Sequence, residues 1–196
     1  MPTGFTEDEQ QKIKEALFHA GIRLIRKYGV QRTTVDKLTK ECGIAKGSFY
    51  LFYSSKEEYL AALSNYTGMK CQEMLLRKLA GRKQMTTREF FEFFREYIYS
   101  DYDLMGSMTI DDFLWLKSHM SEQHFFDPAR LTLVMQGFMD LISDKRDSVD
   151  PGVVTNLVKS IYAMREHRDT FVADALDDSI DLILQTLAEY ISGNRD

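Results

Sequence analysis

The sequence is poor in the residues that cross-link or interrupt a fold. Among its 196 residues there are only two cysteines, Cys42 and Cys71, and three prolines. Two cysteines do not make the disulfide framework of a small secreted domain, so each is interpreted as a buried or unreactive thiol in a reducing cytoplasm. A redox switch is the alternative, although no neighbouring residue singles out either thiol. We therefore expect a cytoplasmic protein.

Long apolar runs are missing as well. No stretch approaches the roughly 18 residues that a membrane-spanning helix requires. The first residues, MPTGFTEDEQQ, are acidic and polar, which is unlike a signal peptide. We expect no membrane partner.

Residue patterns typical of catalysis are also lacking. There are four histidines, and they are scattered; His119 and His124 are five residues apart, off the spacing that puts two ligands on one helix face. No His-Glu-x-x-His run, nucleophile elbow or phosphate-binding glycine loop occurs. The acidic pairs Asp111-Asp112 and Asp177-Asp178 are expected to face water. The sequence therefore predicts no enzyme, no cofactor and no metal site.

Charge is present but unevenly distributed. The formal net charge is −5 and the isoelectric point is near 5.5. The segment from His19 to Lys56 holds eight basic and two acidic residues, so it carries +6 while the remainder carries −11. A basic patch on an acidic body favours phosphate at one face and repels it elsewhere, as a DNA-binding protein requires.

Hydrophobic periodicity and capping residues predict an all-α chain. A capping box at Thr6–Glu9 opens a helix that ends near Tyr28, before Gly29. A long helix begins at Ser54 or Ser55 and ends near Ala80, and an aromatic-rich helix begins at Thr86. Asp-Pro pairs at 127–128 and 150–151 predict further helix starts. The remaining predicted helices span 109–120, 128–146, 151–165 and 170–191.

The segment from Thr33 to Lys56 has the pattern of a helix-turn-helix. Thr33 and Thr34 are caps for a first short helix, and Gly43 suits the left-handed position that ends it. A second short helix, about 46–53, places Lys46, Gly47, Ser48 and Tyr50 on a face that the core does not need. Phe49 is expected in the core. In such motifs the second helix enters the major groove of DNA.

These residues resemble the DNA-binding region of the tetracycline-repressor (TetR) family of bacterial regulators. The resemblance runs from about Ile13 to about Leu63 and rests on Thr33-Thr34-Val35, Cys42-Gly43-Ile44, Lys46-Gly47-Ser48-Phe49-Tyr50, Tyr53 and Ser55-Lys56-Glu57-Glu58. It implies a three-helix DNA-binding domain at 1–55 and a helical ligand-binding and dimerisation domain at 56–196. It also implies that the tilt of the helix after Ser55 transmits the ligand signal.

The resemblance and the motif together predict a DNA-binding set. Its members are Thr33, Thr34, Lys46, Gly47, Ser48, Tyr50 and Lys56. The family often has His and Tyr after the tyrosine matched by Tyr50, where this chain has Leu51 and Phe52. Neither side chain donates a hydrogen bond, so each is left either to pack or to touch a thymine methyl group.

Methionine and aromatic side chains gather in the middle of the chain and predict an adaptable apolar pocket. The candidate effector-binding residues are Met105, Met108, Trp115, Met120, Phe126, Met135, Phe138, Met139 and Tyr162. The alternative is that most of them form core. Arg130, Gln136 and His119 are either polar handles of this pocket or surface residues.

The predicted function is transcriptional regulation by a homodimer paired through helices 151–165 and 170–191. The last of these is more apolar than its own domain requires, and the family resemblance implies a four-helix bundle there. A small apolar or amphipathic effector would release a near-palindromic DNA operator. One alternative is an effector-independent architectural or cell-cycle DNA-binding protein. Another is a helical module whose basic face binds a protein.

Overall fold

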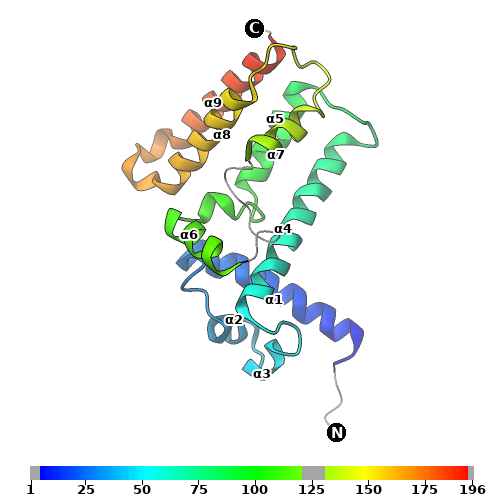
Figure 1. Ribbon diagram of the computed structural model, residues 1–196, viewed down its shortest axis with the longest axis vertical. Coiled ribbons are helices and arrows are strands. Elements are labelled where there is room, and N and C mark those ends of the chain that lie inside the picture. The colour runs from blue at the N-terminus through cyan, green and yellow to red at the C-terminus, as the bar shows by residue number, and fades with distance from the viewer. Residues whose placement is uncertain (1–4, 121–130, 194–196) are drawn as a thin grey trace. The chain divides into compact units, whose positions relative to one another are not determined.

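The computed structural model describes residues 5–120 and 131–193. Within these residues the secondary structure is helical, apart from an isolated β-bridge that pairs Met85 with Ile142 (Figure 1). The predicted all-α class is confirmed. The helix start predicted at Asp127-Pro128 lies outside the described residues. No described helix is long and apolar enough to cross a membrane.

The chain forms two compact units. The described part of the first unit comprises residues 5–68 and 107–120. It contains α1 (Glu7–Tyr28), α2 (Val35–Cys42), α3 (Lys46–Phe49), the first part of α4 (Lys56–Leu79) and α6 (Ile110–His119). The second unit contains the rest of α4 and the helices from α5 onward, except α6. The division predicted at residues 55 and 56 differs from these units, because α4 crosses their boundary and α6 packs with the N-terminal helices.

Local capping explains where the helices of the first unit begin. The Thr6 hydroxyl accepts the Glu9 N–H at 3.3 Å and the Glu9 carboxylate accepts the Thr6 N–H at 2.8 Å, which is the predicted capping box. At the start of α4, the Ser55 hydroxyl accepts the Glu58 N–H at 3.1 Å. The Glu58 carboxylate in turn accepts the Ser54 N–H at 2.7 Å. Both helices therefore start where the sequence pattern places them.

The second unit is built around buried phenylalanine and branched aliphatic residues. Its further elements are α5 (Thr87–Tyr99), α7 (Leu131–Met139), α8 (Pro151–Glu166), α9 (Leu176–Ser192) and the 3-10 turns η3 (Arg168–Thr170) and η4 (Ala173–Ala175). The turn η1 (Met105–Ser107) lies at the unit boundary. In this unit α5 packs on α9, α7 packs on α8, and α8 lies beside α9 (Figure 1).

Two predicted helices of the second unit are longer than the observed ones. The helix predicted over 128–146 ends at Met139, because Leu141 and Ser143 form backbone hydrogen bonds with Met85 instead. The helix predicted over 170–191 begins at Leu176, because the backbone is extended at Phe171 and Val172 between η3 and η4. The predicted start of α8 at Pro151 and the stop at Gly193 are confirmed.

Candidate nucleic-acid interface

A sharp turn joins the two short helices of the helix-turn-helix. The Thr34 hydroxyl caps α2 by accepting the Lys37 N–H at 3.3 Å. At the other end Gly43 adopts φ +67° and ψ 28°, the left-handed conformation that glycine reaches without a steric penalty. The Ile44 N–H then bonds to the Thr39 carbonyl at 3.0 Å, which closes the turn. The predicted roles of Thr34 and Gly43 as local structure are confirmed.

The recognition helix α3 is shorter than predicted. It covers Lys46–Phe49 rather than 46–53, and the chain continues as turns with N–H to carbonyl bonds from Leu51 to Ser48 and from Phe52 to Phe49. Its N-cap, Ala45, has no side chain that accepts a hydrogen bond, so the first turn of α3 has no polar side-chain cap.

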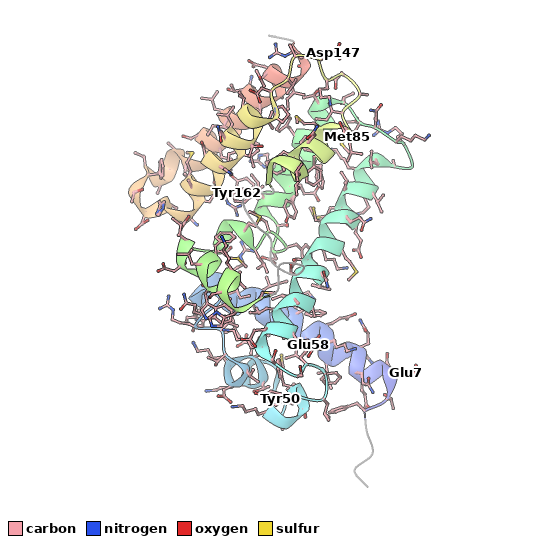
Figure 2. All side chains as sticks on the ribbon, viewed as in Figure 1. Glu7, Tyr50, Glu58, Met85, Asp147 and Tyr162 are labelled. Atoms are coloured by element: carbon pink, nitrogen blue, oxygen red, sulfur yellow. The ribbon has the colours of Figure 1, made fainter. Side chains whose placement is uncertain are left out.

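The side chains of α3 and the turn after it divide into core and surface. Phe49 is completely buried against Tyr53 and Tyr59, with ring centres 5.6 Å away in each case. Lys46, Gly47 and Tyr50 are exposed, Ser48 is half-buried, and Tyr50 lies just beyond the end of α3 (Figure 2). The predicted burial of Phe49 and exposure of Tyr50 are confirmed.

The two residues at which the sequence departs from the family pattern behave differently. Phe52 stacks on Phe5 with a centroid distance of 6.1 Å, so it packs within the protein. Leu51 keeps 72% of its surface exposed and remains available to an apolar group such as a thymine methyl.

Ion pairing shifts the pKa of Lys46, and burial shifts the pKa of Tyr53. The Lys46 ammonium lies 2.9 Å from the Asp36 carboxylate, and this hydrogen bond raises the pKa of Lys46. Lys46 is therefore a cation at neutral pH, and its partner, the Asp36 carboxylate, is itself exposed. Burial, followed by the charge of Glu58, raises the pKa of the Tyr53 hydroxyl to about 12. Tyr53 is thus neutral and acts as a packing residue.

Two members of the predicted DNA-binding set make contacts inside the protein. Thr33 is completely buried and its hydroxyl donates to the Gly29 carbonyl at 2.8 Å. The Lys56 ammonium donates to the carbonyls of Val30 and Gln31 at 2.7 and 3.2 Å. It also lies 4.4 Å from the centre of the Trp115 ring, and burial lowers the pKa of Lys56.

Comparison with known proteins matches the helix-turn-helix segment to a family. The family model described as bacterial regulatory proteins, tetR family, matches residues 17–63, which include the whole helix-turn-helix. The Bacillus subtilis (strain 168) protein YerO, named as an uncharacterized HTH-type transcriptional regulator, is 38% identical over 92 residues, or 43% of this chain and 32% of that protein. A second such regulator, YuxN, is 34% identical over 84 residues, or 38% of this chain and 29% of that protein.

Residues 17–63 of this chain match the TetR family of helix-turn-helix transcriptional regulators. The resemblance inferred from sequence is confirmed for this segment, whose match to transcriptional regulators agrees with the prediction that the protein is not an enzyme. The chain spans about a third of the length of the curated relatives that it matches.

Solved structures share the TetR fold over nearly all of the chain. A TetR-family regulator from Streptomyces coelicolor has a TM-score of 0.61 at 9% identity and covers 93% of this chain and 97% of its own. The fatty acid degradation regulator FadR from Bacillus halodurans has a TM-score of 0.57 at 14% identity, covering 92% and 99%. A γ-butyrolactone receptor described as ArpA-like has a TM-score of 0.56 at 15% identity, covering 91% and 98%.

The predicted effector-binding residues fall into both units. Met108, Trp115 and Met120 belong to the first unit, whereas Met105, Met135, Phe138, Met139 and Tyr162 belong to the second. Phe126 lies outside the described residues. Met135 and Met139 line a small apolar cavity of about 10 Å³ together with α5, α8 and α9. Phe138 packs on Phe90 and Phe93 at 5.9 and 6.4 Å.

Tyr162 has a polar neighbour that its sequence position did not reveal. Its hydroxyl is 3.5 Å from Asp103, a completely buried carboxylate that also pairs with Arg165. Burial raises the pKa of the Tyr162 hydroxyl well above its ordinary value. Gln136 and His119, the predicted polar handles inside the described residues, are both exposed.

Asp112 is the functional candidate that sequence reasoning missed. It was expected to face water, but it is only 4% exposed and its Oδ1 accepts the Val30 N–H at 2.7 Å. The Thr109-x-x-Asp112 spacing of a capping box could have marked it as an α6 cap. Its contact with Val30, 82 residues away, has no sequence signature. Within residues 5–120 and 131–193, no group of three or more His, Cys, Asp or Glu side chains is placed to hold a metal ion.

Proposed function

We propose that this TetR-family protein is a homodimeric repressor that leaves a near-palindromic operator when a small apolar or amphipathic effector binds. The observation that supports it most directly is the surface at α3. Lys46, Gly47 and Tyr50 are exposed there, while the buried side chain of Phe49 anchors the same helix in the core. A rigid scaffold that presents polar and basic groups to solvent is suited to the major groove of DNA.

Each exposed group in this surface has a role that its chemistry fits. Lys46 and Tyr50 donate to phosphate oxygens, and the side of α2 that carries Thr34 faces the sugar-phosphate backbone of the DNA. Gly47 allows close approach to the groove, and the Ser48 hydroxyl meets a base edge or a nearby phosphate. Leu51 contacts a thymine methyl. Contacts to phosphate supply affinity and register, whereas contacts to bases supply sequence preference.

The dimer in this proposal forms through α8 and α9. Val153 on α8 and Leu182 on α9 are exposed, and Leu182 keeps 64% of its surface accessible in the single chain. Covering such apolar area contributes roughly 25 cal/mol per Å² to association. Two copies of α3 held about 34–36 Å apart, or at a multiple of that spacing, would read the two halves of the operator.

The effector in this proposal binds the second unit, where Met135 and Met139 border the phenylalanine-rich core. Methionine side chains adapt to a ligand by changing rotamer, so a cavity of about 10 Å³ can enlarge there. Two fold neighbours are named as a γ-butyrolactone receptor and a fatty acid degradation regulator. We propose an effector of the same general kind, small and apolar or amphipathic.

An effector-independent DNA-binding protein of the same fold is the second candidate. The small volume of the cavity between α5, α7, α8 and α9 favours it, because a cavity of about 10 Å³ holds no more than about one water molecule. Screening fatty acids and lactones for an increase in melting temperature separates the two candidates. Stabilisation together with release of DNA supports the repressor, and no effect from any compound supports the second candidate.

Selection of bound fragments from genomic DNA tests the function as a whole. We expect enrichment of a site with two inverted halves, and an affinity that falls steeply as salt is added. Weak binding without salt dependence would instead favour a protein-binding role for the basic face. The genes beside the selected sites would then indicate which effectors to screen.

A further inference from the structure

A buried carboxylate on α6 binds the connection between α1 and α2. Oδ1 of Asp112 accepts the N–H groups of Val30 and Gln31 at 2.7 and 3.3 Å. Its other oxygen, Oδ2, accepts the N–H and the hydroxyl of Thr109, both at 3.2 Å. All these residues lie in the first unit. One carboxylate therefore caps α6 and at the same time holds two successive peptide N–H groups of the connection.

Lys56 binds the carbonyl groups of the same two residues, Val30 and Gln31. Its ammonium donates to the Val30 and Gln31 carbonyls at 2.7 and 3.2 Å and lies 4.4 Å from the centre of the Trp115 ring. The carboxylate on α6 and the ammonium on α4 thus bind opposite polar groups of the same residues. We call Asp112, Lys56 and Trp115 the clamp. Hydrogen bonds to charged groups are roughly twice as strong as neutral ones, so the clamp holds this connection through strong polar contacts.

The backbone beside the clamp is shaped to admit the carboxylate. Gly29 adopts φ +81° and ψ 169°, a conformation that is essentially restricted to glycine. A Cβ atom added there would lie 3.0 Å from Oδ2 of Asp112. The close approach of the Asp112 carboxylate therefore depends on the absence of a Cβ atom at Gly29.

The clamped connection leads directly into the DNA-reading helices. It ends at Thr34, which caps α2, and α2 carries Asp36, the ion-pair partner of Lys46 on α3. Thr33 anchors the same connection through its bond to the Gly29 carbonyl. A change in the position of Val30 and Gln31 would consequently shift α2 and α3 relative to α1 and α4.

We propose that Asp112 and Lys56 are positioning residues for DNA reading, and that Lys56 itself makes no phosphate contact. The proposal rests on the DNA-binding function proposed above. In the clamp, two donors of the Lys56 ammonium bind carbonyls and the indole of Trp115 covers another side of the cation. Trp115 is the only tryptophan in the chain and therefore reports the state of the clamp by its fluorescence.

The clamp itself is tested without DNA. Asp112→Asn keeps the size of the side chain but removes its charge, and Asp111→Asn makes the same change at the exposed neighbouring position. Lys56→Met keeps the apolar stem and removes the ammonium, with Lys117→Met as its exposed control. We expect Asp112→Asn and Lys56→Met to shift the Trp115 emission maximum and increase its quenching by acrylamide, and both controls to match the wild type. Emission that stays unchanged in all four variants would overturn the clamp.

The positioning role is tested with the duplex fragments that the wild-type protein selects from genomic DNA. Asp112→Asn and Lys56→Met are each expected to bind about tenfold more weakly, the effect of one lost charge-assisted hydrogen bond. For Lys56→Met the slope of log affinity against log salt should equal the wild-type slope. A slope reduced by about one unit would instead make Lys56 a phosphate contact and overturn that part of the proposal.

Thr109→Ala distinguishes a positioning role of Asp112 from a general loss of stability of α6. It removes the cap of α6 but leaves the bonds from Asp112 to Val30 and Gln31 in place. We expect Thr109→Ala to lower the melting temperature and to bind DNA as the wild type does. Equal losses of DNA affinity in Thr109→Ala and Asp112→Asn would overturn the positioning role.

The outcomes also distinguish failure of the proposed DNA-binding function from failure of the positioning role. A wild-type protein that retains no duplex at any salt concentration overturns DNA reading, while the emission test still decides whether the clamp exists. Normal wild-type binding together with an unaffected Asp112→Asn overturns the positioning role alone.

Discussion

The two units of the molecule hold their cores together in different ways. In the first unit, directed hydrogen bonds reach into the core: the buried Tyr59 hydroxyl donates to the Leu17 carbonyl at 2.7 Å, and Asp112 and Thr33 bind backbone groups. The second unit has the buried Asp103–Arg165 pair, but most of its core is phenylalanine, leucine and isoleucine. Apolar contacts have no preferred direction, so such a core can repack at modest cost.

This difference matches what each unit is proposed to do. A DNA-reading surface has to keep its groups in fixed positions, and hydrogen bonds to buried backbone groups allow few alternative arrangements. An effector-binding unit has to admit a ligand, which methionine and phenylalanine side chains do by changing rotamer. The lesson is that rigidity and adaptability are both present in one small chain because they depend on different kinds of contact.

The largest expected effect comes from truncating one buried phenylalanine in each unit. Phe49→Ala and Phe93→Ala should each lower the free energy of unfolding by about 3–5 kcal/mol, since both side chains are almost completely buried. Hydrogen exchange should place the loss of protection in the first unit for Phe49→Ala and in the second for Phe93→Ala. Equal loss in both units for either variant would show that they do not unfold separately.

A charge placed on α9 should affect association rather than folding. Leu182→Glu is expected to weaken dimerisation by roughly 2–3 kcal/mol, because the proposed dimer would cover a side chain that is now charged. Sedimentation velocity at micromolar concentration measures this change. Leu76→Glu, on an exposed site of α4, is the control. A wild-type protein that sediments as a monomer would rule out the two-half-site mechanism.

Two glycines within helices should respond to alanine with opposite signs. A Cβ at Gly21 in α1 would lie 1.9 Å from the Tyr59 hydroxyl oxygen, whereas one at Gly137 in α7 has no neighbour within 4 Å. Gly21→Ala should therefore destabilise the protein by about 2 kcal/mol through overpacking. Gly137→Ala should stabilise it by about 0.5–1 kcal/mol through helix propensity. Urea denaturation measures both, and a neutral Gly21→Ala would contradict the tight packing of Tyr59.

Removing the cation at the start of α3 should weaken DNA binding and change its salt dependence. Lys46→Ala is expected to cost about 1.5 kcal/mol of binding free energy and to lower the salt slope by about one unit. Lys83→Ala, an exposed lysine of the second unit, is the matched control and should bind normally. An unaltered slope for Lys46→Ala would mean that this ammonium remains with Asp36 in the complex.

The smallest effect is expected at the tyrosine hydroxyl beside α3. Tyr50→Phe should weaken DNA binding by about 1 kcal/mol, the contribution of one hydrogen bond, and leave the melting temperature unchanged. In the second unit, Tyr99→Phe loses a bond to Asp177 of 2.9 Å and should leave DNA binding unchanged. If gel-shift affinity is the same for Tyr50→Phe and the wild type, Tyr50 makes no phosphate contact.

The sequence by itself determined the features that depend on neighbouring residues. The Thr6–Glu9 capping box, the Gly43 turn, the start of α8 at Pro151 and the burial of Phe49 all follow from local geometry and hydrophobic spacing. The family resemblance followed from the same short segment, since a turn of fixed shape restricts its residues closely.

Only the tertiary structure decided which polar groups meet across long stretches of sequence. Asp112 is one of two adjacent aspartates in a helix, and its burial depends on peptide groups some 80 residues earlier. Lys56 has the position of a phosphate contact, yet its ammonium is bound to Val30 and Gln31. The packing of α6 and α4 around the connection between α1 and α2 brings these partners together. No local spacing in the sequence predicts these contacts.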